Sequence, residues 1–598
     1  MGDVFDRIAA LPAEKRALLL QQLQERKTIG KVSADSNQYD VAILGGGMAG
    51  LTLALEMKKI RPVTRILVIE KQKQPAPEAA HKVGESTVEI AAHYLRDILG
   101  FEEHLNTQQI RKFGLRMFFS VDDNQDITQR VELGSTIFPP LATYQLDRGR
   151  LENFLGSELR RQGIAFFDGC KVKRIVLQSQ DDFHRLSLLH DGNEREITAR
   201  WVVDASGRSS LLKRQLGLAK KVEHHANAVW FRLAHPIDIN EWSTNPDWHA
   251  RITQGDRFLS TNHLMGPGYW VWLIRLASGS TSVGIVTDAN MYPFEQINRF
   301  DRALNWLHAH EPQCAQVIEE HRAEVQDFRV MKDYSYSCQQ VYSGERWCLT
   351  GEAGIALDPL YSPGSDLIAI SNGLTCDLIA RDLDGEAIQG RAAIHDKLFL
   401  NLTNIWLAIY EQQYSLLSNA QVMVTKIIWD TGFYWGVFGL LYFHDAFRRI
   451  AEQPGIAASL SRIALVSNRV QAFFREWHAI DQPTPSNLFV DLYSPLDFMV
   501  KLHTGMAAGL SPSALEAQFA ENVRLFERLA GLMVSTVIAA HADHLENEAI
   551  LKQIQRWQTD PLLSEMIALY RRESRMNPID SSWIAVGHQK RERQQVVR

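Results

Sequence analysis

The sequence predicts an α/β protein: a Rossmann-type nucleotide-binding domain, a mixed sheet beside it and a helical C-terminal region. Three observations carry this prediction. The stretch YDVAILGGGMAG, residues 39–50, reads as a strand, a tight turn and the start of a helix. Apolar strands that end in small-residue turns return at 201–208 and 347–351. Beyond about residue 385, apolar residues recur at helical spacing and few glycines or prolines interrupt them. Continuous apolar runs are typical of buried parallel strands, and the helical periodicity predicts a separate helical layer.

Length and composition limit the possible function. A chain of 598 residues with 45% hydrophobic residues can bury a large core and form more than one domain. A formal net charge of -6 gives no electrostatic reason to bind nucleic acid or an anionic membrane. Five scattered cysteines have neither metal-ligand spacing nor the density of a disulfide framework. With no targeting segment visible, we expect a cytoplasmic protein that binds no metal and has small-molecule or protein partners.

We divide the chain into three parts: residues 1–38, 39–385 and 386–598. In the first, Leu11–Leu20 has a proline early in a helix and leucines at helical spacing, and a polar linker follows. A helix packed on its own domain is the alternative to a docking role. In the third part, residues 427–443 are apolar but contain Asp430 and three glycines, and they are too few for a bilayer span. We expect a buried helix or helical hairpin there, with an aromatic wall for a lipid-like or carrier-tethered substrate as the alternative.

The glycines of the first strand-turn-helix predict a dinucleotide site. Gly45 allows the turn, Gly47 lets the backbone approach a pyrophosphate, and Gly50 lets helix and strand pack closely. Glu70 ends the second strand about 20 residues later, where a carboxylate can accept the ribose hydroxyls of an adenosine. A glycine-rich turn in an unrelated α/β domain is the alternative.

Later segments of the sequence contain further residues that can bind the same cofactor. Residues 81–87 form a glycine turn before an apolar helical segment and can place backbone donors near a second cofactor face. Arg148 stands near the start of a helix, where its guanidinium can reach phosphate or a ring oxygen. Asp204 ends one buried strand, and Glu352 follows another, where a carboxylate can hold ribityl hydroxyls. These positions indicate a flavin nucleotide.

Over residues 39–372 this set resembles the FAD-binding fold of the p-hydroxybenzoate hydroxylase superfamily, and within it the FADH2-dependent halogenases. The segment YWVWLIR, residues 269–275, resembles the WxWxIP motif and supplies Trp270 and Trp272. Arg111–Gly114 resembles the KFG segment, whose lysine is essential in phenol and pyrrole halogenases. The segment LDPLYSPG, residues 357–364, resembles the FxPxxSxG loop beside the isoalloxazine, with Pro359, Ser362 and Gly364 at the matching positions.

The resemblance implies a chemistry for these residues. A halogenase uses FADH2, oxygen and a halide ion, chloride or bromide, to make hypohalous acid, which passes through a tunnel to an aromatic substrate. Trp270 and Trp272 would keep the substrate away from the flavin, and Lys112 would hydrogen-bond the hypohalous acid or capture it as a haloamine. Each residue has a structural alternative: the tryptophans can fill core, Lys112 can be solvated at a strand start, and Ser362 can serve the turn.

Three departures from the family pattern bear on the outcome. Tyr361 stands where tryptophan halogenases carry a glutamate, which favours a phenol or pyrrole substrate over free tryptophan. Arg275 replaces the motif proline, and Glu352 replaces an aspartate. Either can mark a drift towards hydroxylation. We therefore expect an aromatic halogenase of natural-product biosynthesis, with an FAD-dependent aromatic monooxygenase and a non-catalytic, synthetase-docked flavoprotein as alternatives.

Two partners follow from the same comparison. Leu11–Leu20 resembles the LSPEKRALL-type helix that begins many modules of nonribosomal peptide synthetases, so the substrate can arrive on a peptidyl or acyl carrier protein. Only one glycine fingerprint is present, which implies that a separate NAD(P)H-dependent flavin reductase supplies FADH2.

Overall fold

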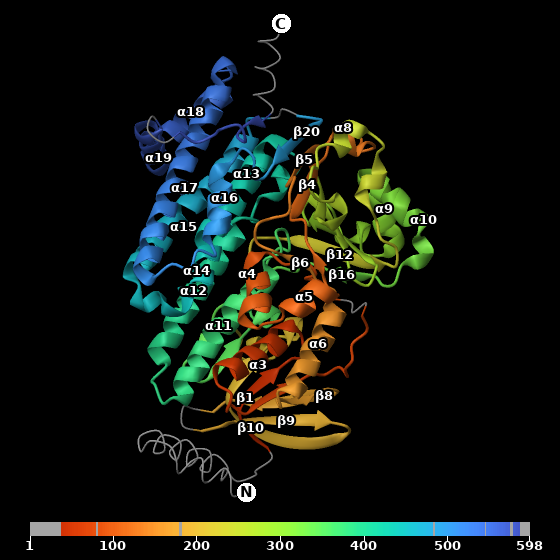
Figure 1. Ribbon diagram of the computed structural model, residues 1–598, viewed down its shortest axis with the longest axis vertical. Coiled ribbons are helices and arrows are strands. Elements are labelled where there is room, and N and C mark those ends of the chain that lie inside the picture. Colours follow the sequence, from red (N-terminus) through yellow and green to blue (C-terminus); the bar gives the residue numbers. More distant parts are fainter. Residues whose placement is uncertain are drawn as a thin grey trace, which may run out of the picture.

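The computed structural model describes residues 37–78, 82–178, 182–481, 485–544, 546–574 and 578–586. It contains two eight-stranded sheets and a large helical region. In Figure 1 the first sheet lies at the lower end of the molecule, the second lies above it, and the C-terminal helices stand along one side. The predicted α/β class with a helical C-terminal region is confirmed. The helix predicted at 11–20 lies outside the described residues.

The first sheet is built on a core of parallel strands. Its strand order is β18-β19-β10-β1-β2-β7; β9 pairs antiparallel with β10, and β8 pairs antiparallel with β9. Leu44 at the end of β1 lies opposite both Ile69 of β2 and Asp204 of β10. The carboxyl ends of these strands therefore share one edge, which is where open α/β sheets bind their ligands. The parallel strands are β1 (Gln38–Leu44), β2 (Ile66–Ile69), β7 (Ala165–Phe167), β10 (Asn193–Asp204) and β19 (Trp347–Leu349).

Three helices meet beside this sheet. Helix α3 (Met48–Ile60) follows the glycine turn directly and packs against α6 (Arg148–Arg161) and α11 (Gly364–Leu383). Ten of the thirteen residues of α3 are buried, because the helix lies between the sheet and its two neighbours. Figure 1 shows α3 and α6 in front of the sheet, with α11 leading from it towards the C-terminal helices.

The second sheet is mixed, as predicted. Its order is β16-β12-β15-β14-β13-β4-β5-β20, and the pairs β13 with β4 and β5 with β20 are parallel. The central strand β14 has a different core on each face: Tyr269, Val271 and Leu273 pack under α9 and α10, whereas Trp270 and Trp272 face the main core. Because side chains alternate between the two faces of a strand, both tryptophans lie on the face towards the first sheet. The strands and covering helices are β4 (Leu115–Phe119), β5 (Val131–Gly134), β12 (Ala226–Leu233), β13 (Thr261–Gly266), β14 (Tyr269–Arg275), β15 (Thr281–Asp288), β16 (Arg329–Met331), β20 (Leu488–Asp491), α9 (Phe300–His310) and α10 (Pro312–Glu320).

Beyond residue 385, the described residues form helices, their connecting loops and one strand. The pairs α15 with α17 and α17 with α19 form the largest helix contacts of this region. The strand is β20, a half-buried four-residue strand that joins the edge of the second sheet beside β5. The expectation of an almost wholly helical region missed this strand, since four residues carry too little periodicity to be noticed. The main helices are α12 (Gln389–Ala408), α13 (Ala420–Phe433), α15 (Pro454–His478), α17 (Pro512–Ala540), α18 (Glu548–Thr559) and α19 (Pro561–Glu573).

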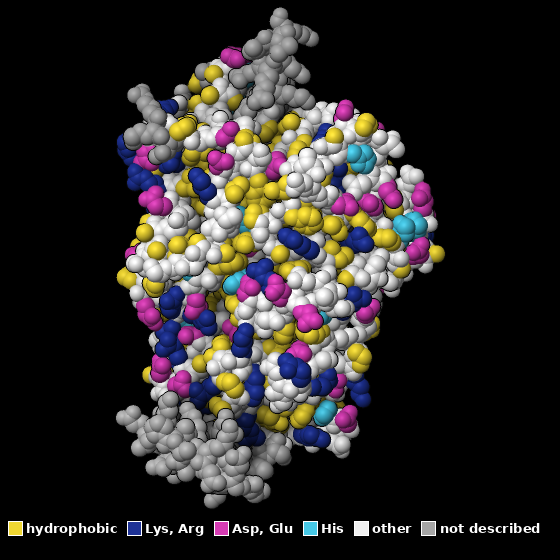
Figure 2. All heavy atoms as spheres, viewed as in Figure 1, with side chains coloured by type: hydrophobic (Ala, Val, Ile, Leu, Met, Phe, Trp, Pro, Cys, Tyr) yellow, Lys and Arg dark blue, Asp and Glu magenta, His cyan; other side chains and the backbone are white. Residues whose placement is uncertain are grey.

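The apolar stretch 427–443 is the buried helix that its sequence predicts. It runs through α13, a π-helical turn (Tyr434–Gly439, labelled η10) and α14 (Leu440–Phe443). A Cβ added at Gly436 would lie 2.9 Å from side-chain atoms of Leu502 and Phe526, so this glycine permits close packing of α16 (Asp497–Gly505) and α17. Within the described part of the chain, no helix is long and apolar enough to cross a bilayer. Figure 2 shows acidic and basic side chains interspersed over the face in view.

Candidate functional site

A large cavity of about 760 Å³ opens at the carboxyl edge of the first sheet. The glycine turn after β1, the loop 82–86, the loop 357–364 and the inner face of β14 all contribute to its lining. It is large enough for a dinucleotide-sized cofactor, and it lies at the position where the sheet topology predicts a ligand. Each part of this lining can be traced to particular residues.

The three predicted glycines occupy three different environments. Gly45 has φ +123°, and a Cβ there would lie 2.2 Å from the Ala205 carbonyl oxygen. A Cβ on Gly50 would lie 2.0 Å from the Gly45 oxygen, so helix and strand meet where only glycine fits. At Gly47 the nearest atom to an added Cβ is Glu152 Oε1 at 3.9 Å, and the residue lines the cavity. A side chain at 47 would therefore project into the space that a pyrophosphate needs.

Carboxylates hold the turn and the start of α3. Glu70 lines the cavity, and its Oε2 accepts the Gly46 amide at 2.7 Å. Glu152 lies in α6, where its Oε1 accepts the Met48 amide at 3.3 Å and Arg148 Nη2 at 2.7 Å. Arg148 also lines the cavity and donates to the Val83 carbonyl at 2.8 Å, so it connects α6 with the loop 82–86. Glu152 escaped prediction because it lies 104 residues from Met48 and belongs to no motif.

The remaining predicted cofactor residues divide into two groups. Glu352, Pro359 and Gly364 line the large cavity. Asp204 does not: it is buried, and its carboxylate accepts the amides of Ser206 at 3.0 Å and Leu212 at 2.7 Å. We therefore assign Asp204 to holding the turn after β10, behind the cavity lining.

A second, small cavity of about 80 Å³ lies beyond the loop 82–88. Lys112 lines it, and Pro363 lines both cavities. Lys112 Nζ donates to Ser86 Oγ at 2.8 Å and to the Thr87 carbonyl at 2.9 Å. Ser86 in turn lines the large cavity and shares a hydrogen bond of 3.0 Å with Thr261 Oγ1. The lysine thus stands at the partition between the two cavities.

Burial changes the acid-base chemistry of Lys112. The side chain is 1% exposed, which removes the alternative of a solvated lysine. Burial lowers the pKa of its ammonium to about 7, although the nearby carboxyl groups of Glu89 and Asp366 oppose this shift. A substantial fraction of the amine is therefore neutral near pH 7, and a neutral amine is the nucleophilic form.

Trp270 and Trp272, which we call the tryptophan wall, both line the large cavity. Their ring centroids are 5.6 Å apart, and the two rings are tilted by 43°. Trp272 Nε1 donates to Ser282 Oγ at 3.1 Å, and Trp270 Nε1 donates to the Tyr414 hydroxyl at 3.0 Å. Both tryptophans are buried, so they fill core and line the cavity at once.

Behind the wall lies a buried carboxylate that sequence reasoning missed. Asp358 Oδ2 lies within hydrogen-bond distance of three side chains: Tyr414 OH at 2.6 Å, Tyr334 OH at 2.7 Å and His224 Nε2 at 2.7 Å. Its Oδ1 accepts the Leu360 amide at 2.9 Å. Asp358 belongs to the predicted loop 357–364, but its partners are distant in sequence and have no motif of their own.

The loop 357–364 contributes to both cavities. Tyr361 and Ser362 have φ of +69° and +61°, a left-handed conformation that is uncommon for residues other than glycine and recurs at functional sites. Ser362 lines the large cavity, whereas Tyr361 lines the small one and donates its hydroxyl proton to Asp430 Oδ2 at 3.3 Å. Pro363 lies between them and lines both.

Arg275, the departure from the tryptophan motif, packs on a neighbouring aromatic ring. Its guanidinium stacks over the Phe258 ring with 3.9 Å from Cζ to the ring centroid. It is absent from the lining of either cavity. The charge that replaces the motif proline therefore lines neither cavity.

The fold and part of the sequence are similar to those of known FAD-binding proteins. A family model described as an FAD binding domain matches residues 38–277, which include the glycine turn, Lys112 and the tryptophan wall. The structure of the halogenase PltM aligns with a TM-score of 0.61 at 18% identity, over 81% of this chain and 99% of that one. PltM in complex with phloroglucinol and FAD gives 0.58 at 16% identity, over 89% and 96%. The chain therefore has the fold of an FAD-dependent flavoprotein.

Several proteins with similar sequences are flavin-dependent halogenases. The flavin-dependent halogenase chlA of Dictyostelium discoideum is 26% identical over 436 residues, 67% of this chain and 70% of the relative. A 1H-pyrrole-2-carbonyl peptidyl-carrier protein chlorinase of Pseudomonas fluorescens is 27% identical, over 55% and 72%. The corresponding brominase of Pseudoalteromonas luteoviolacea is 26% identical, over 59% and 80%. The resemblance to flavin-dependent halogenases is confirmed.

Proposed function

We propose that this protein is a flavin-dependent halogenase that chlorinates or brominates an aromatic, phenol- or pyrrole-like substrate. The position of Lys112 carries this proposal: a buried amine with a lowered pKa stands between a cofactor-sized cavity and a small cavity. The halogenase relatives support the reaction type.

The large cavity fits FAD. The turn at Gly45 and Gly47 can receive the pyrophosphate, Glu70 the adenosine ribose, and Arg148 and Glu352 the phosphate and ribityl groups. Bound as FADH2, the cofactor would supply hypohalous acid from oxygen and a halide ion. Residues of the chain would then transfer the halogen to the substrate.

Lys112 would transfer the halogen. Its neutral amine attacks the halogen of hypohalous acid, a nitrogen–halogen bond forms, the halogen–oxygen bond breaks, and hydroxide leaves with an amine proton as water. The aromatic carbon then attacks the halogen, the nitrogen–halogen bond breaks, and the ring proton restores the amine. Alternatively, Lys112 hydrogen-bonds hypohalous acid and orients it towards the ring. In both cases the lysine must face the small cavity, and it does.

The geometry disfavours the two other functions. A monooxygenase needs the substrate in contact with the flavin, but the tryptophan wall lines the large cavity and Lys112 faces the small one. Arg275, the residue that favoured hydroxylation, packs on Phe258 and lines neither cavity. An idle flavoprotein would have no use for a lysine buried beside a cavity, since removing an amine from water costs free energy even when it is hydrogen-bonded.

We also propose partners and a setting. Two relatives are named for pyrrole groups bound to a peptidyl carrier protein, which supports a carrier-tethered substrate and a role in natural-product biosynthesis. A separate NAD(P)H-dependent flavin reductase would supply FADH2. The cysteines of the described chain, all five of the sequence, are free thiols, which supports a reducing cytoplasm.

Mass spectrometry of the product tests the function. The full chain is supplied with FAD, a flavin reductase, NADH and either chloride or bromide, and is offered phenol and pyrrole esters and carrier thioesters. A product with the halogen isotope pattern that requires halide supports the proposal. An oxygenated product that forms equally without halide would establish the monooxygenase instead.

A further inference from the structure

We infer that Ser86 is a positioning residue for Lys112: together with the Thr87 carbonyl it holds both hydrogens of the neutral amine, so that the nitrogen lone pair faces the small cavity. This inference rests on the proposed function, in which that lone pair attacks hypohalous acid. It goes beyond that function because it assigns the direction of the attack to a serine outside the tryptophan, KFG and LDPLYSPG segments.

The short strand β6 (Tyr144–Gln145) anchors both sides of this contact. On one side it pairs with β3 (Ile110–Arg111), the two residues before Lys112. On the other side, Thr87 donates its amide to the first carbonyl of β6 at 2.9 Å, and Ser86 forms a β-bridge to the second residue of β6. The lysine, the serine and the threonine are all buried. One backbone framework therefore holds the amine and its two acceptors.

The hydrogens of the neutral amine match these two acceptors in number. A neutral amine carries two hydrogens and one lone pair at tetrahedral positions around nitrogen, beside its bond to carbon. Lys112 Nζ donates to Ser86 Oγ at 2.8 Å and to the Thr87 carbonyl at 2.9 Å, which uses both hydrogens. The lone pair then takes the remaining position, on the side of the small cavity that Lys112 lines. The ammonium form would place a third hydrogen there.

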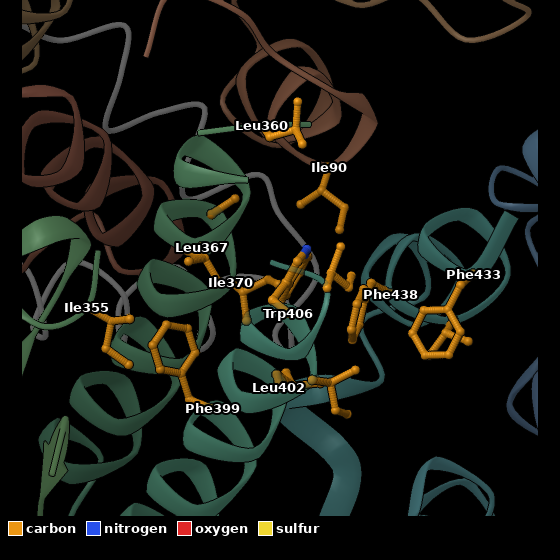
Figure 3. Packing of buried hydrophobic residues seen from close by; sticks show 14 of the residues in the cluster. Ile90, Ile355, Leu360, Leu367, Ile370, Phe399, Leu402, Trp406, Phe433 and Phe438 are labelled. Carbon is orange, nitrogen blue, oxygen red and sulfur yellow. The ribbon is translucent and has the colours of Figure 1, made fainter. Parts of the chain in front are cut away.

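Part of the lining of the small cavity is aromatic. Trp406 and Phe438 line it, with ring centroids 4.0 Å apart and an angle of 17° between the ring planes. Figure 3 shows the two rings packed side by side among other buried hydrophobic residues. Such a surface gives an ammonium hydrogen no acceptor, whereas a lone pair needs no partner. This part of the lining therefore suits the neutral amine.

The carboxyl groups of the small cavity have other partners. Glu89 lies 3.1 Å from His503 Nε2, and Asp366 accepts the Tyr434 hydroxyl at 2.8 Å. Both carboxyl groups raise the pKa of Lys112 through their charge, but among the described residues neither forms an ion pair with it. The direction of the amine is therefore set by its two hydrogen bonds.

Thr261 keeps the Ser86 hydroxyl in the accepting orientation. A serine hydroxyl has one hydrogen and two lone pairs. Ser86 Oγ accepts a hydrogen from Lys112 and lies 3.0 Å from Thr261 Oγ1, so its own hydrogen is directed at Thr261. Without that acceptor, the Ser86 hydrogen could turn to the amine nitrogen and occupy its lone pair. Thr261 therefore keeps the lone pair of the lysine free.

Reductive methylation of Lys112 tests the inference apart from catalysis. The FAD-loaded full chain is treated briefly with formaldehyde and cyanoborohydride from about pH 5 to about pH 9, and peptide mass spectrometry measures the methylation of Lys112. Formaldehyde is small enough for a cavity of about 80 Å³ and reacts with the neutral amine. The pH profile therefore gives both a midpoint and a limiting rate for this one lysine.

Ser86→Ala should lower the limiting rate about tenfold, because the amine loses one of the two contacts that orient its lone pair. The midpoint should move to lower pH, since the Ser86 oxygen also accepts from the ammonium form. A residue that acted on protonation alone would instead raise the rate near neutral pH. Ser86→Thr keeps the hydroxyl and should restore the rate.

Ser467→Ala is the matched control, because Ser467 is a buried serine of α15 that lines neither cavity. It should leave both the midpoint and the limiting rate of Lys112 at their wild-type values. An unchanged limiting rate in Ser86→Ala, or no methylation of Lys112 in the wild type, would overturn the inference.

Thr261→Val gives a second measurement that leaves Ser86 in place. The Ser86 hydrogen then has no acceptor at position 261, so the limiting rate should again fall several-fold, whereas Thr261→Ser keeps the hydroxyl and the rate. Ser86 and Thr261 also line the large cavity, so FAD occupancy and melting temperature are measured for each variant. Methylation at the wild-type rate in folded Thr261→Val would contradict the role of Thr261.

Turnover separates this inference from the proposed function. Ser86→Ala should lower kcat for halogenated product about tenfold and leave the KM of the aromatic substrate little changed. Methylation and halogenation that are both unaffected by Ser86→Ala would overturn the inference and leave the halogenase intact. Methylation that depends on Ser86, in a chain that forms no halogenated product, would support the positioned amine and overturn the halogenase.

Discussion

The indole N–H of Trp270 donates a hydrogen bond to the hydroxyl of Tyr414 across 3.0 Å, and Tyr414 donates in turn to Asp358 across 2.6 Å. A residue from the C-terminal helical region thus fixes the orientation of the tryptophan wall. Asp358 belongs to the loop that lines both cavities, so the wall and the loop share one support. All three side chains are buried, and a buried hydrogen-bonded network of this kind holds its members in one arrangement.

Tyr414→Phe should loosen Trp270 without disturbing the cofactor. The variant removes one hydroxyl and leaves the Trp270 N–H unsatisfied, at a cost of about 1–3 kcal/mol. FAD occupancy should stay at the wild-type level, while halogenated product per NADH consumed should fall several-fold. Tyr292→Phe is the matched control, because its hydroxyl bonds the Pro267 carbonyl on the opposite face of β14. Wild-type coupling in Tyr414→Phe would show that the hydroxyl does not position the wall.

Lys112→Ala should separate flavin chemistry from halogen transfer. The amine faces the small cavity and is absent from the lining of the large one, so FAD binding and NADH consumption should persist. Halogenated product should fall by about two to four orders of magnitude, the range for a nucleophile or acid-base group. Mass spectrometry with chloride and bromide measures the loss, and Lys552→Ala, an exposed lysine of α18, is the control. An undiminished isotope pattern in Lys112→Ala would remove the lysine from the mechanism.

Gly47→Val should abolish FAD binding while the fold survives. An added side chain meets little protein at position 47, with Glu152 Oε1 at 3.9 Å from the Cβ, but it occupies the cavity beside the turn. Flavin absorbance after gel filtration should fall below about a tenth of wild type, with little change in melting temperature. Gly390→Ala in α12, where an added Cβ has open space, controls for the loss of a glycine. Full flavin occupancy in Gly47→Val would place the pyrophosphate elsewhere.

The sequence was most informative where the chemistry is local. The apolar run before Gly45 spans only a few residues, so it predicts a strand and the turn that follows it. The alternation of Trp270 and Trp272 is equally local and predicts that both side chains lie on one face of a strand. The resemblance of the tryptophan and KFG segments predicts that Lys112, Trp270 and Trp272 belong to the site, and all three line a cavity.

What the sequence could not provide was the pairing of distant segments. Tyr414 lies 56 residues from Asp358, and Glu152 lies 104 residues from Met48. Such pairs produce no recognisable pattern in the sequence, because only the packing of helices on sheets brings the two residues together. The acidic lining of the small cavity is of the same kind, since Glu89, Asp366 and Asp430 come from three separate elements.

The rate of halogenation should rise with pH through the titration of Lys112. Burial lowers the pKa of this amine to about 7, whereas Glu89 and Asp366 raise it. Below that pKa the ammonium form dominates and cannot attack the halogen, so log kcat/KM should rise about one unit per pH unit and level off above pH 7. The profile is measured with a neutral phenol ester whose hydroxyl does not titrate in this range.

Glu89→Gln should shift the midpoint of this pH profile in a direction that can be predicted. Glu89 stabilises the ammonium form, so its removal should move the midpoint to lower pH while the plateau keeps its halogenated product. His503 Nε2 lies 3.1 Å from the Glu89 carboxylate, and Asp366 lines the same cavity. Loss of the Glu89 charge also lowers the pKa of Asp366, whose carboxylate then offsets part of the shift at Lys112. Asp384→Asn, an exposed site at the end of α11, removes the same charge far from the amine and should leave the midpoint in place. A midpoint that moves upward in Glu89→Gln, or a profile that falls through pH 7 in the wild type, would show that the neutral amine of Lys112 is not the reacting form.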